Sequence, residues 1–446
     1  MSQGKRQLIN LKWQGIWNCT QAGVLLFPLL PTFGAIGLGL AILVTWKQKY
    51  REIIQRPLNW GLALLSVWLG IASCFAWKPT EAFLGLANFL PFFILFAAFS
   101  VLIQTPAQLR QLAWMLVIPS LPVVILGLGQ LFLGWTGSEP LHGVLGWVLD
   151  ANGNPPGRIA SVFMYANILA AYLQIVFILG VGLWIGTFQS LRQRWNKFQA
   201  WVLLFLSIAI IGNAIALILT SSRNAWGITF LACLAFALYL GWRWIVIGVT
   251  VAAASILWAS FGPEFGRQSL RSIIPAYIWA RLSDQMYPNR PAVLLRTSQW
   301  QFAWTMIQER PWLGWGLRNF TPLYQDKMQV WLGHPHNLLL MLGAETGIPA
   351  TLVFCGLVGW VLAQAVLLLR VWSDVAPSTD TQDCYPDKLI LFTYLIAFGS
   401  CVLFNLLDVT LFDLRVNTLG WLLLSAICGV VYHAKEISIK QKLRSR

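Results

Sequence analysis

The segment 296–347 brings together the residue types best suited to chemistry. Arg296 and Trp300 are spaced by one helical turn, and further apolar residues follow at helical spacing. His334 and His336, two of the four histidines in the chain, then open a long apolar run. A neutral imidazole can remove a proton from a hydroxyl group. We therefore expect a reaction at this end of a membrane span.

The composition predicts an all-α polytopic membrane protein. Of the 446 residues, 57% are hydrophobic and only 11% are charged, which excludes an ordinary soluble protein. Because a transmembrane helix needs roughly 20 apolar residues, we predict about 12 such helices in a single integral membrane domain, 1–446. The first two apolar runs are short and contain prolines, so they could instead form one broken span. The runs are 15–29, 31–46, 57–76, 82–104, 111–134, 159–186, 199–220, 224–242, 244–261, 336–370, 388–407 and 413–433.

The net charge of +15 is distributed along the spans in a way that indicates membrane orientation rather than nucleic-acid binding. If successive spans alternate in direction, nineteen lysines and arginines share the side of the N-terminus. The short loops of the opposite side hold only Lys78, Arg158, Arg223 and Arg415. By the positive-inside rule, we predict that both termini are cytoplasmic.

One outer loop, 262–335, is far longer than an ordinary connection, and such loops usually carry function. It contains two helix-like stretches, around 273–285 and 297–309. The predicted topology places many ionisable residues on the same side as this loop, where they could converge. These residues are Arg158, Arg223, Arg296, His334, His336, Asp408, Asp413 and Arg415.

Arginines and a histidine on one face of a membrane favour a particular chemistry. The arginine fork matches phosphate oxygens in a bidentate manner and stays charged at any working pH. Arginines that hold a diphosphate leaving group, beside a histidine that activates a hydroxyl, would make a site for glycosyl transfer from a lipid-linked sugar. The guanidinium groups can neutralise the departing diphosphate, so we expect neither a metal nor another cofactor.

At these residues the chain resembles the O-antigen ligase and polymerase superfamily of polytopic membrane proteins. The resemblance depends on three motifs and their order: TSSRNAW at 220–226, R-x3-W ending in RPWLGWGLRNF at 296–320, and HPHNLLLMLGAETG at 334–347. The segment GRIASVFMYANILAAYL at 157–173 is also similar to the family. Each motif alone is weak, but their order, spacing and common side make the set fairly specific.

The resemblance implies a GT-C-like glycosyltransferase in the bacterial inner membrane, with its active face and large loop in the periplasm. Family members transfer a glycan from an undecaprenyl-diphosphate carrier to a lipid or polysaccharide acceptor. Carried over by motif, Arg223 and Arg296 would bind the diphosphate, and His336 would be the base on the acceptor hydroxyl. Arg318 departs from the family pattern, in which a small residue is expected. The residues that could support this site are Arg158, Arg318, His334, Glu345, Asp408 and Arg415.

Both arginines also have a plain structural interpretation. Arg223 could simply anchor a short hairpin at the membrane surface. Arg296 could pair with Asp284 or Glu309 and only order the loop.

The same holds for the other candidates. His336 could cap the span that follows it, and His334 is better explained as structural because Pro335 turns the chain between the two. Glu345 lies inside a span and is expected to satisfy a buried backbone group or an arginine. The tryptophans of the loop could stack on sugars, although tryptophan is also common at membrane interfaces.

Transport is the alternative function. A branch that resembles this chain is described as an inorganic-carbon or bicarbonate transporter. A bicarbonate site would need cations near the bilayer midplane, whereas the candidate cations gather at the outer face. The sequence favours glycosyl transfer and leaves ligase and polymerase both open.

Overall fold

The computed structural model describes residues 3–138, 143, 145–283, 285, 291–374 and 384–444. Within these ranges every element is a helix, apart from an isolated bridge between Gly153 and Arg158. The elements are α1 (Gln3–Leu26), α2 (Pro31–Ile54), α3 (Pro57–Cys74), α4 (Pro79–Gly85), η1 (Leu86–Asn88), α5 (Leu90–Leu102), α6 (Pro106–Val117), α7 (Ser120–Phe132), α9 (Ala166–Gln193), α10 (Lys197–Leu219), α11 (Arg223–Tyr239), α12 (Arg243–Phe261), α13 (Glu264–Ile273), α14 (Ala276–Leu282), η2 (Ala292–Leu294), α15 (Arg296–Glu309), α16 (Phe320–Met328), α17 (Leu338–Asp374), α18 (Cys384–Asn405) and α19 (Leu414–Arg444).

Nine candidate membrane spans are found among the described residues, by length and composition. They coincide with nine of the twelve apolar runs and confirm a multi-pass, all-helical membrane protein. The other three runs lie in α1, α2 and α11, which are helical but are shorter or more polar. α1 and α2 are two separate helices that pack closely through Gly23 and Gly37. The exact number of twelve spans stays a prediction.

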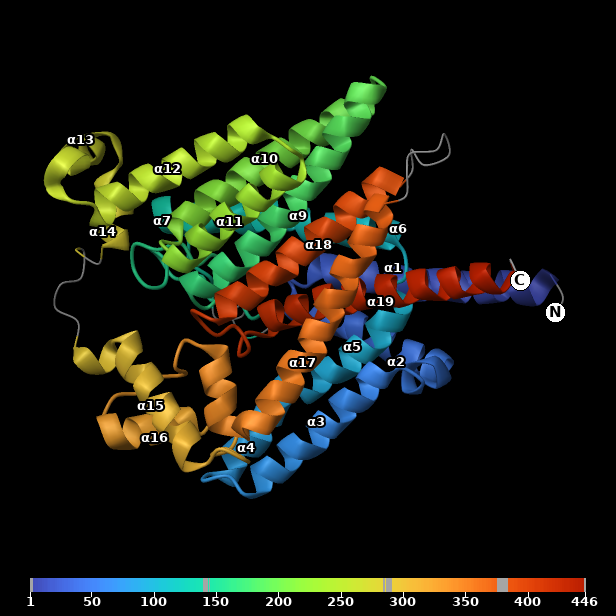
Figure 1. Ribbon diagram of the computed structural model, residues 1–446, viewed down its shortest axis with the longest axis horizontal. Coiled ribbons are helices and arrows are strands. Elements are labelled where there is room, and N and C mark those ends of the chain that lie inside the picture. Colours follow the sequence, from blue (N-terminus) through green and yellow to red (C-terminus); the bar gives the residue numbers. More distant parts are fainter. Residues whose placement is uncertain are drawn as a thin grey trace.

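The two ends of the helix bundle differ in what they carry. α1 begins and α19 ends at one end, whereas α13, α14, α15 and α16 lie at the other (Figure 1). We call the second end the loop end. The start of α1 and the end of α19 thus lie at the end of the bundle opposite the long loop, and the side of the membrane on which each lies stays a prediction.

The bundle is organised around α9 and α19. Of the most apolar stretches of these two helices, 83% and 89% of the residues are buried, against 11% for α12. α9 packs on α10 and α18, and α19 packs on α5. Because lipid covers the outer helices, the two buried helices provide the rigid frame on which the residues at the loop end are mounted.

α17 is interrupted at Gly347, and residues 311–319, which we call the strap, close the interruption. Gly347 has a φ of +82° and a ψ of 164°, outside the helical region. Pro349 has no N–H, so the carbonyl of Glu345 has no partner within the helix. The amide of Gly316 in the strap donates to this carbonyl at 2.8 Å.

Two more hydrogen bonds fix the strap to the broken helix. Trp315 N donates to Ala344 O at 2.9 Å, and Ile348 N donates to Pro311 O at 2.8 Å. The approach is so close that a Cβ on Gly347 would lie 2.0 Å from the carbonyl oxygen of Trp312. The glycines of the RPWLGWGLRNF motif are equally confined: a Cβ on Gly314 would lie 2.4 Å from the carbonyl carbon of Glu345, and a Cβ on Gly316 would lie 2.2 Å from the Cβ of Ala76.

Candidate functional site

Four arginines from different parts of the sequence line one cavity at the loop end. The cavity has a volume of about 270 Å³, and Arg158, Arg223, Arg281 and Arg296 all contribute to its wall. None of the residues that line it is an aspartate or a glutamate. The remaining lining residues are Tyr165, Asn167, Ser221, Ser222, Asn224, Leu294, Leu295 and His336. The cavity, which we call the arginine cavity, is suited to an anion with several negative charges.

The α10–α11 hairpin positions Arg223. Ser221 adopts a φ of +52°, which turns the chain sharply, and Arg223 becomes the first residue of α11. Its Nη1 donates to the carbonyls of Arg281 and Leu282 at 3.2 and 3.4 Å, and these carbonyls lie at the C-terminal end of α14. In return, Arg281 Nε donates to Ser221 O at 3.3 Å. The hydroxyl of Tyr277 also contacts the hydroxyl of Ser221, so α14 is tied to the hairpin.

Arg158 connects the arginine cavity to a buried carboxylate. Its Nε donates to Thr220 O at 2.7 Å, and its Nη2 donates to Asn167 Oδ1. Asn167 Nδ2 then donates to Asp408 Oδ2 at 2.7 Å. Arg158 is therefore linked to Asp408 through one amide side chain.

His336 and Asp408 form a hydrogen-bonded pair. The two atoms His336 Nδ1 and Asp408 Oδ1 are 2.8 Å apart, and Val409 N also donates to this oxygen at 2.9 Å. Burial alone would raise the pKa of Asp408, but the hydrogen bond and the charge from His336 lower it to about 2. An ionised Asp408 accepts the Nδ1 proton, so the Nε2 atom of a neutral His336 carries a free lone pair. That is the form that a general base requires.

His334 supports this arrangement in its neutral form. Burial, reinforced by the positive charges of His336 and Arg296, lowers the pKa of His334 to about 4, although Asp408 opposes this shift. The ring stacks on Phe412, with centroids 5.9 Å apart, and its Nδ1 accepts a hydrogen bond from the backbone N–H of His336 at 3.1 Å. The backbone of His336, with a φ of +53°, is held in place by this contact.

Three of these residues also form a group that could hold a metal ion. The candidate ligand atoms of His334, His336 and Asp408 all lie within 4.8 Å of one another. However, His334 Nδ1 already accepts a hydrogen bond, which places the ring proton on Nε2, the atom that faces Asp408. A metal would need that atom unprotonated. The arrangement therefore fits a hydrogen-bonded cluster better than a metal site.

A larger groove adjoins the arginine cavity, and His336 lies at the junction. The groove has a volume of about 870 Å³ and shares Tyr165, Asn167 and His336 with the arginine cavity. Its wall also includes the exposed Trp331 and the buried Asp408. The other lining residues include Lys78, Glu81, Arg318, Thr321, Gln325, His334, Phe412 and Asp413. An anion in the cavity and a second molecule in the groove would meet at His336.

Three of the expected supporting residues lie outside the arginine cavity and make other contacts. Arg415 lines neither hollow: its Nη1 donates to Val162 O at 3.0 Å, and its guanidinium lies over the ring of Phe163. Arg318 pairs with Glu81 at 3.4 Å on the wall of the groove. Glu345 is buried.

Glu345 behaves as the structural interpretation expects. Its Oε1 accepts a hydrogen bond from the backbone N–H of Phe320, the first residue of α16, at 3.1 Å. This contact adds to the hydrogen bonds between the strap and α17. Glu345 thus helps to fix the start of α16 to a membrane span.

Of the two ion-pair partners expected for Arg296, one is distant and the other cannot be compared. Glu309 ends α15, which Arg296 begins, so the two residues are about 20 Å apart along the helix axis. Asp284 lies outside the described residues. Asp408, one of the expected supporting residues, binds His336.

Sequence reasoning missed two residues of the site. Arg281 is buried and lines the arginine cavity from α14, within the stretch 273–285 that was expected to be helical. Its only signal was that it is one more arginine in the long loop. Asn167 lies within the segment 157–173 that is similar to the family, but its role depends on the approach of two distant segments, 158 and 408.

The fold and the site together define a multi-pass α-helical membrane protein with an arginine-lined cavity beside a histidine–aspartate pair. The family model described as O-antigen ligase matches residues 206–355, a range that includes Arg223, Arg281, Arg296 and His336. This match confirms the resemblance to the O-antigen ligase superfamily, and it does not support the transport alternative. No curated protein matches the chain.

Proposed function

We propose that this protein is a membrane glycosyltransferase of the O-antigen ligase and polymerase type. It transfers a glycan from an undecaprenyl-diphosphate carrier to a hydroxyl group of a lipid or polysaccharide acceptor. The observation that carries this proposal is the position of His336, paired with Asp408, at the junction of the arginine cavity and the groove. The proposed setting is the inner membrane of a bacterium, with the loop end in the periplasm.

The arginine cavity binds the diphosphate of the donor. Arg223 and Arg296 contact its oxygens, and Arg158 and Arg281 add positive charge to the same wall. Four guanidinium groups with no carboxylate among the lining residues can stabilise the negative charge that develops on a leaving diphosphate. The arginines thus fill the role that a metal ion has in other phosphate sites, and the reaction needs no metal.

His336 activates the acceptor. Its Nε2 takes the proton of the acceptor hydroxyl while the acceptor oxygen forms a bond to the anomeric carbon of the donor. The bond between this carbon and the diphosphate oxygen breaks, and the diphosphate leaves with the electron pair. Asp408 then stabilises the imidazolium that has formed. The groove holds the acceptor, and Trp331 offers a ring face on which a sugar can stack.

The test is transfer by the purified protein in nanodiscs. The donor is a synthetic polyprenyl-diphosphate glycan, the acceptors are a lipid and a polysaccharide, and EDTA is present throughout. We expect His336→Ala to abolish transfer. His433→Ala is the matched control, because His433 lies in the C-terminal part of α19, in a different helix from the site.

A second pair of variants tests the arginine cavity. We expect Arg223→Lys to lower transfer strongly, because lysine keeps the charge but loses the bidentate fork. Arg243→Lys is the control, since Arg243 is likewise the first residue of a helix, α12, but does not line the cavity. Wild-type transfer by both His336→Ala and Arg223→Lys would contradict the site assignment.

A further inference from the structure

The groove beside His336 carries two exposed cations that have no part in the proposed reaction. Lys78 directly precedes α4 and Arg318 lies in the strap, and both line the groove. The side chain of Asn319 holds these two segments together, because its Oδ1 accepts a hydrogen bond from Lys78 N at 2.8 Å and its Nδ2 donates to Lys78 O at 3.4 Å. Lys78 and Arg318 thus lie on one part of the groove wall, which we call the basic wall.

The backbone conformation of Arg318 does not favour arginine. Its φ is +60°, in the left-handed region that glycine adopts freely and a long side chain rarely adopts. Six described residues other than glycine have a positive φ, and three of them, Ser221, Arg318 and His336, line the arginine cavity or the groove. Strained backbone of this kind is concentrated at functional sites. Ser221 turns the hairpin and His336 is the proposed base, which leaves the conformation of Arg318 to be explained.

The ion pair of Arg318 is too weak to explain an arginine at this position. The closest contact with Glu81 joins Nη2 to Oε2 at 3.4 Å, which is longer than an ordinary hydrogen bond between charged groups. Both side chains are partly exposed, at 43% and 38%, and exposed ion pairs add little to stability. The backbone N–H of Arg318 bonds to the carboxylate of Glu345, but any residue other than proline supplies that N–H. The guanidinium is therefore available to a ligand in the groove.

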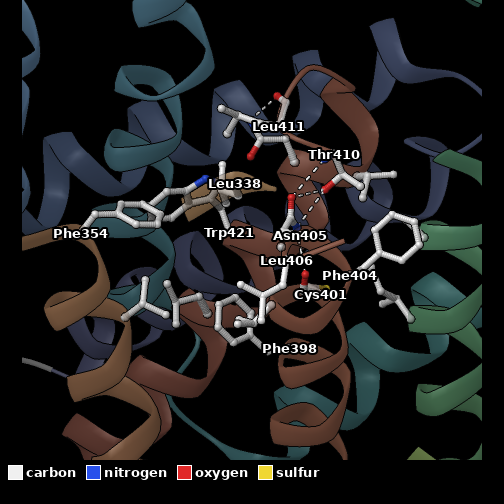
Figure 2. Close-up of a pocket in the computed structure, with 18 of the residues that line it drawn as sticks. Leu338, Phe354, Phe398, Cys401, Phe404, Asn405, Leu406, Thr410, Leu411 and Trp421 are labelled. Carbon is white, nitrogen blue, oxygen red and sulfur yellow. Dashed lines mark hydrogen bonds between the residues drawn. The ribbon is translucent and has the colours of Figure 1, made fainter. Parts of the chain in front are cut away.

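The acidic residues that line the groove away from the basic wall belong to another segment, the loop between α18 and α19. Asp408 and Asp413 lie in this loop, and Asp408 is bonded to His336. Hydrogen bonds between Asn405 and Thr410 close the loop: Thr410 N donates to Asn405 Oδ1 at 3.1 Å, and Asn405 Nδ2 donates to Thr410 Oγ1 at 3.2 Å (Figure 2). A molecule that lies along the groove can therefore place a hydroxyl at His336 and another group at the basic wall.

We propose that Lys78 and Arg318 bind an anionic substituent, a phosphate or a carboxylate, of the acceptor whose hydroxyl reaches His336. This inference rests on the proposed function, because it takes the groove to be the acceptor site. Two cations beside the single carboxylate of Glu81 give this part of the wall an excess of one positive charge. The planar fork of the arginine fits both kinds of anion. Glu81 holds the guanidinium until the ligand arrives, and neutral acceptors bind less tightly.

Binding of sugar probes in the absence of any donor tests the basic wall directly. The probes are maltotriose, maltotriose with a phosphate at one C6, and maltotriose with the same C6 oxidised to a carboxylate. Each is titrated against the full-length protein in nanodiscs and observed by NMR. We expect both charged probes to bind about 10-fold more tightly than maltotriose, the lower end of the range for a hydrogen bond to a charged group, because Arg318 is exposed. The charged probe that binds more tightly identifies the anion of the acceptor.

Substitutions by glutamine, each of which removes one charge, locate the binding of the charged probes. Arg318→Gln should remove most of the preference for them, and Glu81→Gln should increase it by up to about 5-fold, because the competing carboxylate is gone. Arg310→Gln is the matched control and should keep the preference, since Arg310 directly precedes the strap and lines neither hollow. Equal binding of all three probes by the wild type would overturn the proposal. So would loss of the preference in Arg296→Gln instead of Arg318→Gln, which would assign the probes to the arginine cavity.

Transfer assays with the same probes as acceptors separate this inference from the proposed function. We expect Arg318→Gln to raise the KM for the charged acceptors by about 10-fold and to leave kcat and the KM for maltotriose unchanged. A KM that rises equally for all three acceptors, as a merely structural role of Arg318 predicts, or for none of them, would overturn the proposal. Absence of transfer by the wild type to any acceptor, with the binding preference intact, would refute the proposed function and leave the anion site in place.

Discussion

The pair formed by His336 and Asp408 gives the sharpest prediction, the effect of Asp408→Asn. The variant keeps the shape of the side chain and removes its charge. In the wild type, Asp408 accepts hydrogen bonds from His336, from the backbone of Val409 and from Asn167. An amide can accept through only one of its two polar atoms, so at least one of these donors will face an N–H group.

The introduced amide can take either of two orientations, and both lower the rate of glycan transfer. If the introduced N–H faces His336, the imidazole must take the opposite tautomer, and Nε2 then carries a proton and cannot act as a base. If the oxygen faces His336 instead, the charge that stabilises the imidazolium is still lost. A hydrogen bond to a charged group contributes about 1.5–3 kcal/mol, which is roughly 10- to 150-fold in rate. A tautomer reversal in Ser-His-Asp hydrolases costs about 10⁴-fold.

We therefore expect kcat for glycan transfer to fall by about 10- to 10⁴-fold in Asp408→Asn, with little change in the KM for the donor. The assay is steady-state transfer in nanodiscs across a range of pH values. Asp387→Asn is the control, since Asp387 pairs with Arg110 at 2.8 Å in the first turn of α18 and lines neither the arginine cavity nor the groove. An unchanged kcat in Asp408→Asn would refute the role given to the pair, whatever its effect on stability.

Three further predictions concern other parts of the molecule. Arg281→Gln should raise the KM for the donor by about 10-fold while the protein remains folded, because one of the four positive charges around the diphosphate is lost; an unchanged KM would remove Arg281 from the diphosphate site. The pKa of His334 is lowered to about 4 in the folded protein, whereas in the unfolded chain it is about 6.5. Between these pH values only the unfolded chain binds a proton at this residue, so the free energy of unfolding falls as the pH falls, by on the order of 3 kcal/mol. His334→Phe should keep the stacking on Phe412 and flatten this decline, as measured by Tm at pH 7 and pH 4.5; an equally steep decline would argue against a buried neutral imidazole. Gly347→Ala should lower Tm markedly, since its φ of +82° suits glycine and its Cβ would lie 2.0 Å from a carbonyl oxygen, whereas Gly356→Ala should not.

The sequence predicted which residues share one side of the membrane, because this follows from the alternation of the spans. Alternating spans place Arg158, Arg223, Arg296 and His336 on one side, and the structure places all four around the arginine cavity. The topology assigns each residue to a side of the membrane but does not say where its side chain points. It could therefore not distinguish Arg415, which points towards Val162, from the residues that face the cavity.

The remaining differences have equally local causes. Asn167 became part of the site only because α9 lies between the segments that carry Arg158 and Asp408. The break in α17 was not predicted, because Pro349 and Gly347 were read as parts of one apolar run. A proline can stay within a membrane span when another segment satisfies the freed carbonyl, and here the strap does so.

The strap also has a mechanical consequence. It joins the wall of the groove to α17 through backbone hydrogen bonds, so that wall could lift away only if the membrane span itself came apart at Gly347. The strap then serves as a fixed part of the roof on that side and cannot swing open as a hinged cover. If the protein transfers glycans as proposed, its substrates would enter beneath the strap from the side, along the membrane surface. How long the protein retains a growing or finished glycan would then depend on how fast the glycan diffuses along the groove. Release of the glycan would require no large conformational change.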